Sequence, residues 1–205
     1  KDFAWSATSS GSDNIDQYLE ELCNPDGSPA TRASDHYLFR GKCTPMTTFD
    51  AGVLKGGGKP EQRVVFKVTE HGPVSGTATV KGKPYAVAAR RSTRGRDALS
   101  ARAFADLNTN AVRSAKDFAK VMNQVEFTFN WHYVDDRDIA FFSSGRLPVR
   151  APGVDPSLPT LGTGDYEWRG WLARSKHPQA INPASGELLN WNNKPAPGFG
   201  AADDQ

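Results

Sequence analysis

The chain has 205 residues, of which 38% are hydrophobic and 23% are charged, and its formal net charge is +2 at pH 7. These values are typical of a globular protein with one or two domains. No apolar run approaches the length of a membrane-spanning helix, the N-terminal KDFAWSATSS lacks the apolar core of a signal peptide, and the basic run ARRSTRGR lacks the interleaved aromatic residues of a nucleic-acid groove.

The stretch SDNIDQYLEELC is the first predicted element. Its apolar residues recur at i, i+3, i+4 and i+7, which predicts an amphipathic helix. Ser12 or Asp13 would cap the start of this helix. The residues that form its apolar stripe are Ile15, Tyr18, Leu19 and Leu22.

The only two cysteines are Cys23 and Cys43, and a loop-like segment lies between them. A disulfide closing this loop would contribute a few kcal/mol and would indicate an oxidising compartment. Two buried thiols are the alternative, and the spacing leaves both open. No His/Cys spacing typical of a zinc site is present.

Strand patterns dominate the middle of the chain. The β-branched run RVVFKVTEHGPV, from Arg63 to Val74, breaks at HGP and predicts a hairpin with KPYAVAARR after a KGK turn. FTFNWHYVDDRDIAFFSSG, from Phe127 to Gly145, predicts two strands around a DDRD turn. LLNWNN predicts a last short strand.

Two further helices are predicted between these strands. SAKDFAKVMNQV begins with Ser114 and Asp117 in a capping-box arrangement, and a third helix is expected around Ala98–Asn108. The helix that follows Ser114 would bury Ala115, Phe118, Ala119 and Met122. The whole chain therefore reads as one α+β segment, residues 1–205, with predominantly antiparallel sheet and a long proline-rich loop from Arg146 to Pro183.

General catalytic motifs are missing from the sequence. No GxSxG elbow, P-loop or strand-borne GxGxxG is present, and the four histidines have no triad-like spacing. Carboxylates at Asp13, Asp16, Asp203 and Asp204 offer oxygens of the kind that calcium prefers. Asn192, at a rigid strand end, could donate to an oxyanion or simply close a turn.

In their order along the chain, several segments together resemble the penicillin acylase family of N-terminal-nucleophile hydrolases. The segments are WSATSSGSDNIDQYLEEL, TEHGPV, FNWHYVDDRDIAFFSSGRLPVR, DPSLPTLGTGDYEWRGW and HPQAINPASGELLNWNNKPAPG. The resemblance covers nearly all 205 residues and implies part of an αββα sandwich.

The resemblance also implies a mechanism. A precursor cuts itself, and the serine exposed at the new N-terminus attacks an acyl amide with its own α-amine as base. The side chain of Asn192 and the backbone N–H of Ser9 would stabilise the oxyanion. Ala7 and Phe129 would line the acyl pocket. The substrate would be a penicillin, an acyl-homoserine lactone or a lipopeptide, and no organic cofactor is expected.

A calcium site follows from the same resemblance. Its ligands would be the side chains of Asp13, Asp16 and Asp203 and the carbonyls of Ile15 and Pro156. One further ligand is expected from the small chain of the same precursor. The implied location is periplasmic or secreted.

The chain departs from the family pattern at its ends. The nucleophilic serine is expected upstream of Lys1, and the small chain and the rest of the large chain are expected elsewhere in the precursor. We therefore expect these residues to be inactive alone. One alternative is a non-catalytic, calcium-stabilised binding module derived from an acylase. Another is a carbohydrate-binding β domain that uses Trp168, Trp171 and Trp191.

Overall fold

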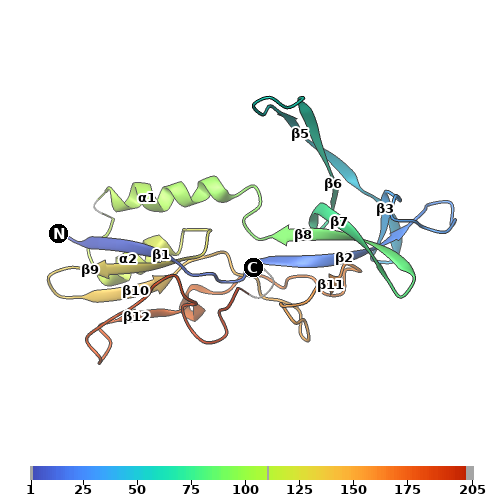
Figure 1. The fold of residues 1–205 in the computed structure, drawn as a ribbon. Coiled ribbons are helices and arrows are strands. Elements are labelled where there is room, and N and C mark those ends of the chain that lie inside the picture. The colour runs from blue at the N-terminus through green and yellow to red at the C-terminus, as the bar shows by residue number, and fades with distance from the viewer. Residues whose placement is uncertain (1, 110, 202–205) are drawn as a thin grey trace. The chain divides into compact units, whose positions relative to one another are not determined.

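A computed structural model describes residues 2–109 and 111–201 (Figure 1). The chain divides into two compact units. The first unit draws on residues 1–14, 92–149 and 168–205, and the second on residues 15–91 and 150–167. The segment that sequence patterns suggest is a single α+β domain therefore contains two bodies, each with its own sheet.

The first unit is built on an antiparallel sheet with the strand order β1-β9-β10-β12. Its strands are β1 (Ala4–Ser9), β9 (Phe129–Val134), β10 (Ile139–Ser143) and β12 (Gln179–Ile181). The hairpin β9–β10 confirms the two strands predicted around DDRD. Asp135 closes its turn by accepting hydrogen bonds from the backbone N–H groups of Arg137 and Asp138, both at 2.8 Å.

Helices cover one face of this sheet. They are the 3-10 helix η1 (Asp97–Ser100), α1 (Ala101–Leu107) and α2 (Ala115–Met122), with the short η2 (Arg174–Lys176) later in the chain. The two helices predicted around Ala98–Asn108 and after Ser114 are confirmed. The Ser114 side chain accepts a hydrogen bond from the Asp117 backbone N–H at 3.2 Å and so begins α2 as the sequence indicates.

The core of the first unit lies between α1, α2 and the alternate residues of the sheet that face them. It is rich in large aromatic side chains, which bury the most apolar surface per residue. Its fully or nearly fully buried members include Phe118, Met122, Trp131, Tyr133 and Phe142.

The second unit contains a sheet with the strand order β4-β3-β2-β8-β7-β6-β5, and β11 pairs with β2. The strands are β2 (Ile15–Cys23), β3 (His36–Phe39), β4 (Lys42–Pro45), β5 (Thr47–Leu54), β6 (Gln62–Thr69), β7 (Gly72–Val80), β8 (Lys83–Arg91) and β11 (Thr160–Leu161). The run from Arg63 to Val74 thus divides between β6 and β7 at HGP, and β8 pairs with β7 on one side and β2 on the other.

The predicted helix over SDNIDQYLEELC is wrong, because these residues form strand β2. Burial along β2 alternates with period 2, and the buried positions are Asp16, Tyr18, Glu20 and Leu22. Ladder pairing with β8 from Ile15 to Glu21, and with β3 at Leu22 and Cys23, outweighs the local helical stripe. The proposed caps at Ser12 and Asp13 therefore have no helix to begin.

Glycines allow the backbone to approach closely at two points of this unit. A Cβ on Gly72, whose φ is 139°, would lie 2.2 Å from the carbonyl oxygen of Ala89. A Cβ on Gly162 would lie 2.0 Å from the Glu20 carboxylate. The glycines of the HGP and GTG segments thus meet a steric requirement at these positions.

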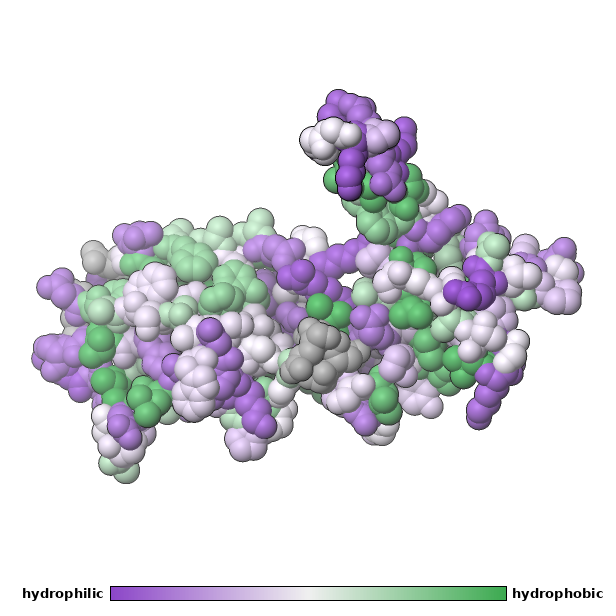
Figure 2. All heavy atoms as spheres, in the orientation of Figure 1, coloured by the Kyte–Doolittle hydropathy of each residue, from purple (hydrophilic) through white to green (hydrophobic). Residues whose placement is uncertain are grey.

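Strands β5 and β6 form a hairpin that pairs with the rest of the sheet only through Val68 and Thr69. Every residue of β5 is exposed. Polar residues occupy the tip of the hairpin, and apolar residues follow its stem (Figure 2). The cross-strand pair Phe49–Phe66 lies on this stem.

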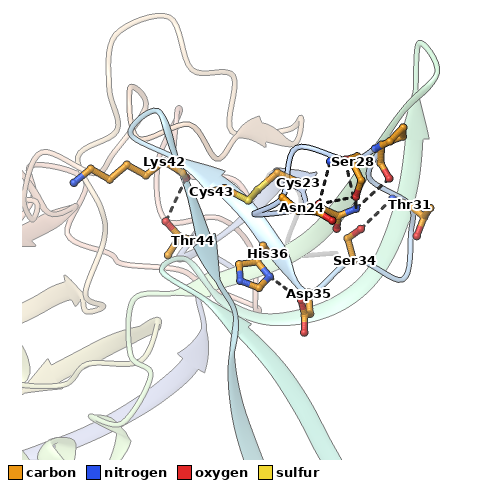
Figure 3. Close-up of a disulfide and its surroundings, with 12 residues drawn as sticks. Cys23, Asn24, Ser28, Thr31, Ser34, Asp35, His36, Lys42, Cys43 and Thr44 are labelled. Atoms are coloured by element: carbon orange, nitrogen blue, oxygen red, sulfur yellow. Dashed lines mark hydrogen bonds and ion pairs between the residues drawn. A yellow bond between two sulfur atoms is a disulfide. The ribbon is translucent and has the colours of Figure 1, made fainter.

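A disulfide between Cys23 and Cys43 joins the end of β2 to β4 (Figure 3). The two Cα atoms lie 6.0 Å apart, within the ordinary range for such a bridge. The bridge settles the alternative that the cysteine spacing leaves open. In the loop beside it, the Asn24 side-chain amide donates to the Ser28 hydroxyl at 3.0 Å (Figure 3).

The last predicted strand, LLNWNN, is also wrong, since residues 188–193 form an irregular segment. Within residues 2–109 and 111–201, no helix is long and apolar enough to cross a membrane.

Candidate active site

The pairing of β1 with β9 assembles three of the predicted site residues at one end of the first unit's sheet. Ser9 lies opposite Phe129, and Ala7 lies opposite Trp131. Ala7 and Phe129 are partly buried and pack against the aromatic core. The Phe129 ring meets the Phe127 ring edge-on, with 5.1 Å between their centroids. An apolar wall therefore borders the Ser9 backbone.

Residues 188–193 bring the predicted asparagine to the same place. Leu189 and Trp191 are 75% and 74% exposed, whereas the side chains of Asn190 and Asn192 turn toward β1. The backbone N–H of Ser9 donates to Asn192 Oδ1 at 2.8 Å. The two groups expected to form an oxyanion site thus lie in direct contact, although 183 positions separate them in sequence.

The contact shows what a bound substrate would have to change. Both groups must donate to one substrate oxygen if they are to stabilise an oxyanion. In this structure, Asn192 Oδ1 accepts the hydrogen bond from the Ser9 N–H. A substrate oxygen would take the place of Oδ1, and the amide of Asn192 would turn to present Nδ2. Since Asn192 is exposed, its side chain has room for this rotation.

Three further residues of this region were not predicted to belong to the site: Thr8, Asn130 and Asn190. The Thr8 hydroxyl donates to Asn190 Oδ1, and Asn190 Oδ1 also accepts from the Asn192 backbone N–H at 3.2 Å. Asn130 is fully buried and donates to backbone carbonyls on both sides of the site. For Asn190, the sequence signal was the alternation in LNWN, which places Asn190 and Asn192 on the same side of an extended segment.

The residues predicted to hold calcium fall in different parts of the chain. Asp13 belongs to the first unit, where its backbone N–H donates to the Gly200 carbonyl at 3.1 Å. Ile15, Asp16 and Pro156 belong to the second unit, and Asp203 lies outside the described residues. Among residues 2–109 and 111–201, no group of three or more His, Cys, Asp or Glu side chains is close enough to hold a metal.

The chemistry of these residues fits a hard cation, because every predicted ligand offers an oxygen. The Asp16 carboxylate accepts three hydrogen bonds from the Arg150 guanidinium, at 2.7, 2.9 and 3.0 Å. An ionised carboxylate has about four acceptor lone pairs, so this pair does not by itself exclude a cation. Calcium binding by these residues stays a prediction.

His132 lies on the sheet face opposite the helices, beside an apolar hollow. The hollow has a volume of about 310 Å³, and its walls include Ser6, Val134, Ile139 and Leu188. Burial lowers the pKa of His132. Among the described residues, no hydrogen bond joins His132 to a nucleophilic side chain.

The tryptophans expected in a carbohydrate site behave differently from one another. Trp168 and Trp171 pack edge-on with 5.6 Å between ring centroids. The Arg146 guanidinium lies over the Trp171 ring at 3.6 Å and covers one of its faces. Trp191 is exposed and directly precedes Asn192.

Comparison with known proteins identifies relatives. A family model described as penicillin amidase matches residues 1–203. The chain is 28% identical over 201 residues to penicillin G acylase of Escherichia coli. It is 30% identical over 201 residues to the acyl-homoserine lactone acylase QuiP of Pseudomonas syringae pv. syringae. These matches include 98% and 96% of the chain but only 22% and 23% of the relatives.

A solved structure agrees with this result. The thermostable penicillin G acylase from Alcaligenes faecalis matches 98% of the chain with a TM-score of 0.83 and 30% sequence identity, and the match covers 34% of that acylase chain. The α+β fold with mainly antiparallel sheet, expected as part of an N-terminal-nucleophile hydrolase, is therefore confirmed. The chain belongs to the penicillin amidase family of acylases.

Proposed function

We propose that these residues are part of an amidohydrolase that cleaves a linear acyl amide. The nucleophile is an N-terminal serine outside the 205 residues, and the attack passes through a tetrahedral intermediate. Ser9 contributes its backbone N–H and Asn192 its side-chain amide to the oxyanion. The observation that carries the proposal is the 2.8 Å contact between these two groups.

The surroundings of this contact support the assignment. The exposed Asn192 has a φ of 68°, in the left-handed region, which asparagine tolerates better than most residues do. The backbone conformation directs its side chain to β1 rather than along its own segment. Ala7 and Phe129 add apolar surface for the acyl group. Penicillins, acyl-homoserine lactones and lipopeptides all present such a group next to an amide.

Calcium and location complete the proposal. Asp13, Asp16, Asp203 and the carbonyls of Ile15 and Pro156 hold a calcium ion, together with a residue of the small chain of the same precursor. The ion serves structure rather than chemistry. The disulfide between Cys23 and Cys43 supports a periplasmic or secreted location, because such bridges persist in oxidising compartments.

The test is hydrolysis of a panel of acyl-p-nitroanilides by the full-length protein that contains these residues, with and without Asn192→Ala. We expect kcat to fall about 100- to 1,000-fold in this variant, as for the loss of one oxyanion donor. Asn193→Ala is the matched control. It removes side-chain hydrogen bonds to Trp191 and Lys194 at 3.1 and 3.2 Å but keeps the Asn192 side chain.

Each outcome bears on the proposal. A large loss for Asn192→Ala with a loss under about tenfold for Asn193→Ala supports the oxyanion role. Equal losses of kcat in the two variants would show that the conformation of the segment matters and that the Asn192 amide has no specific role. Activity in the 205-residue chain alone would place a nucleophile within it and contradict the serine outside it. Silence of the full-length protein on every substrate would favour a non-catalytic, calcium-stabilised binding module.

A further inference from the structure

Asn130 joins the two polypeptide segments that supply the proposed oxyanion donors. Its side-chain Nδ2 donates to the carbonyl of Ser9 at 3.4 Å and to the carbonyl of Asn193 at 3.1 Å. Ser9 carries one donor, and Asn193 directly follows Asn192, which carries the other. One amide group in β9 therefore spans the gap between β1 and the segment 188–193.

The orientation of this amide is fixed. Two carbonyl oxygens face Nδ2, so turning the amide over would set Oδ1 against both of them. Asn130 is fully buried, which makes an unmatched polar group here costly. Its Oδ1 is buried and has no hydrogen-bond partner among residues 2–109 and 111–201. The polar contribution of Asn130 at this position is thus its two donor hydrogens.

A second bridge runs parallel to the first. Thr8, which lies opposite Asn130 in the β1–β9 ladder, donates to Asn190. Asn190 in turn accepts from the backbone N–H of Asn192. This second bridge attaches the segment to β1 through Asn190, whereas Asn130 attaches it to β9 through the carbonyl of Asn193. Loss of Asn130 would leave the segment attached but free to shift.

We propose that Asn130 is a positioning residue that sets the distance and angle between the Ser9 N–H and the Asn192 amide. This inference rests on the proposed function for its catalytic consequence, but its structural part stands independently. A misplacement of about 1 Å in such a site can cost about 100-fold in rate. The effect falls on kcat rather than KM, because the interaction strengthens in the transition state.

Asn182, an exposed asparagine of the same unit, provides a control for the loss of two side-chain hydrogen bonds. Its Oδ1 accepts from the Ile139 backbone N–H at 2.9 Å, and its Nδ2 donates to Asp138 at 2.7 Å. Asn182 directly follows β12 and bonds the first residue of β10 and the residue before it. Replacing it removes two hydrogen bonds, as replacing Asn130 does, without touching Ser9 or Asn192.

The activity test compares Asn130→Asp, Asn130→Ser and Asn182→Ser in the full-length protein. Asn130→Asp sets an oxygen against both carbonyls, and we expect kcat to fall about 100-fold with KM within about twofold. A serine hydroxyl can donate to one of the two carbonyls, so Asn130→Ser retains part of the rate. In an Asn192→Ala background, the effect of Asn130→Asp shrinks severalfold, because the two residues act together.

The structural test measures amide hydrogen exchange in the full-length protein and does not need activity. In Asn130→Ser the Ser9 amide exchanges at least about tenfold faster while the Ile139 amide is unchanged. In Asn182→Ser the pattern is reversed. If the unmutated protein hydrolyses no amide, the proposed function fails, and the exchange pattern still decides whether Asn130 holds the site.

Two results would overturn the inference. One is a rate for Asn130→Asp within about twofold of the rate for Asn182→Ser, with equal exchange at Ser9. The other is full additivity with Asn192→Ala, which would give Asn130 a general role in stability. If Asn130→Asp fails to fold, Asn130→Ser carries both tests, since it introduces no buried charge.

Discussion

The two units reach stability by different routes. The first buries aromatic side chains of its sheet, such as Trp131 and Phe142, against Phe118 and Met122 of α2. The second has a much smaller apolar cluster, built around Leu22, Tyr37 and Ala86. It adds a disulfide and a set of buried charges. The unit that carries the candidate site is therefore stabilised mainly by apolar burial, and the other unit by its disulfide and its buried ion pairs.

The buried charges of the second unit centre on His71. Its Nδ1 lies 2.7 Å from Glu20 and its Nε2 lies 2.6 Å from Glu167, and Tyr18 stacks on the ring with 3.8 Å between centroids. Arg90 pairs with the second oxygen of Glu167 at 2.5 Å. Such pairs are costly to leave half-made. The stability of the second unit therefore depends on specific charged partners, whereas that of the first depends on how much apolar surface its core buries.

The largest effect should come from emptying the aromatic core. Phe118→Ala removes a fully buried ring between α2 and the sheet, and we expect a loss of about 3–5 kcal/mol in unfolding free energy. Phe49→Ala is the matched change in the second unit, where the ring is 54% exposed. It should cost under about 1 kcal/mol. Urea unfolding measures both, and equal losses would contradict the comparison.

The disulfide should come next. Replacing Cys23 and Cys43 by serine reopens the loop between them, which we expect to cost about 3 kcal/mol, as for loops of comparable length. The loss should fall on amides of the second unit, because both cysteines lie there. Hydrogen exchange with and without a reducing agent checks this. The double variant, insensitive to the reducing agent, is the control, and uniform loss of protection across both units would refute the assignment.

The charge cluster should respond to pH in a defined direction. Burial works against the charged form of His71, but the hydrogen bonds that its ring N–H groups donate to Glu167 and Glu20 outweigh burial and raise the pKa of His71. Its contribution to stability is therefore present below pH ~6.5 and is lost as pH rises through the raised pKa. Although burial opposes the shift, His71 and Arg90 lower the pKa of Glu167 to about 2. That contribution is present above pH ~4.5 and is lost as pH falls toward 2.

His71→Gln tests this behaviour. At pH 6 the variant should be less stable by about 1.5–3 kcal/mol, the range for hydrogen bonds to charged groups. The difference from the unmutated chain should shrink at alkaline pH, where His71 has lost its charge. The measurement is the free energy of unfolding from pH 5 to 10. A difference that stays constant over this range would show that His71 contributes packing alone.

Strand β2 shows why the second unit was harder to predict than the first. The sequence of β2 does contain a helical stripe of apolar residues, but two of the four side chains that the strand buries, Asp16 and Glu20, are charged. Asp16 and Glu20 are paired in the interior with Arg150 and His71, which are distant in sequence. Such partners are invisible to local periodicity. The hairpin β9–β10 and α2 were predictable because a turn and a cap within each segment determine them.

The candidate site was predictable only in part and for a similar reason. Ser9 and Asn192 follow from a resemblance in motif, not from local physics. The segment 188–193 has the alternation of a strand but pairs with no strand among the described residues, and its asparagines make side-chain bonds to β1. Asn130 looked like one more buried strand residue, because its role depends on the carbonyls of Ser9 and Asn193, which the fold brings together.

The smallest effect should come from a cap that acts within one turn of helix. Ser114→Ala removes the acceptor for the Asp117 N–H at the start of α2, and we expect a loss of about 1 kcal/mol. Ser28→Ala is the control in the second unit, where the hydroxyl bonds Asp26 at 2.7 Å in an exposed loop, and it should change stability by under about 0.5 kcal/mol. Thermal unfolding resolves this difference. If the two serines cost the same, local signals would matter equally in both units, and the contrast between them would rest on the core and the cross-links alone.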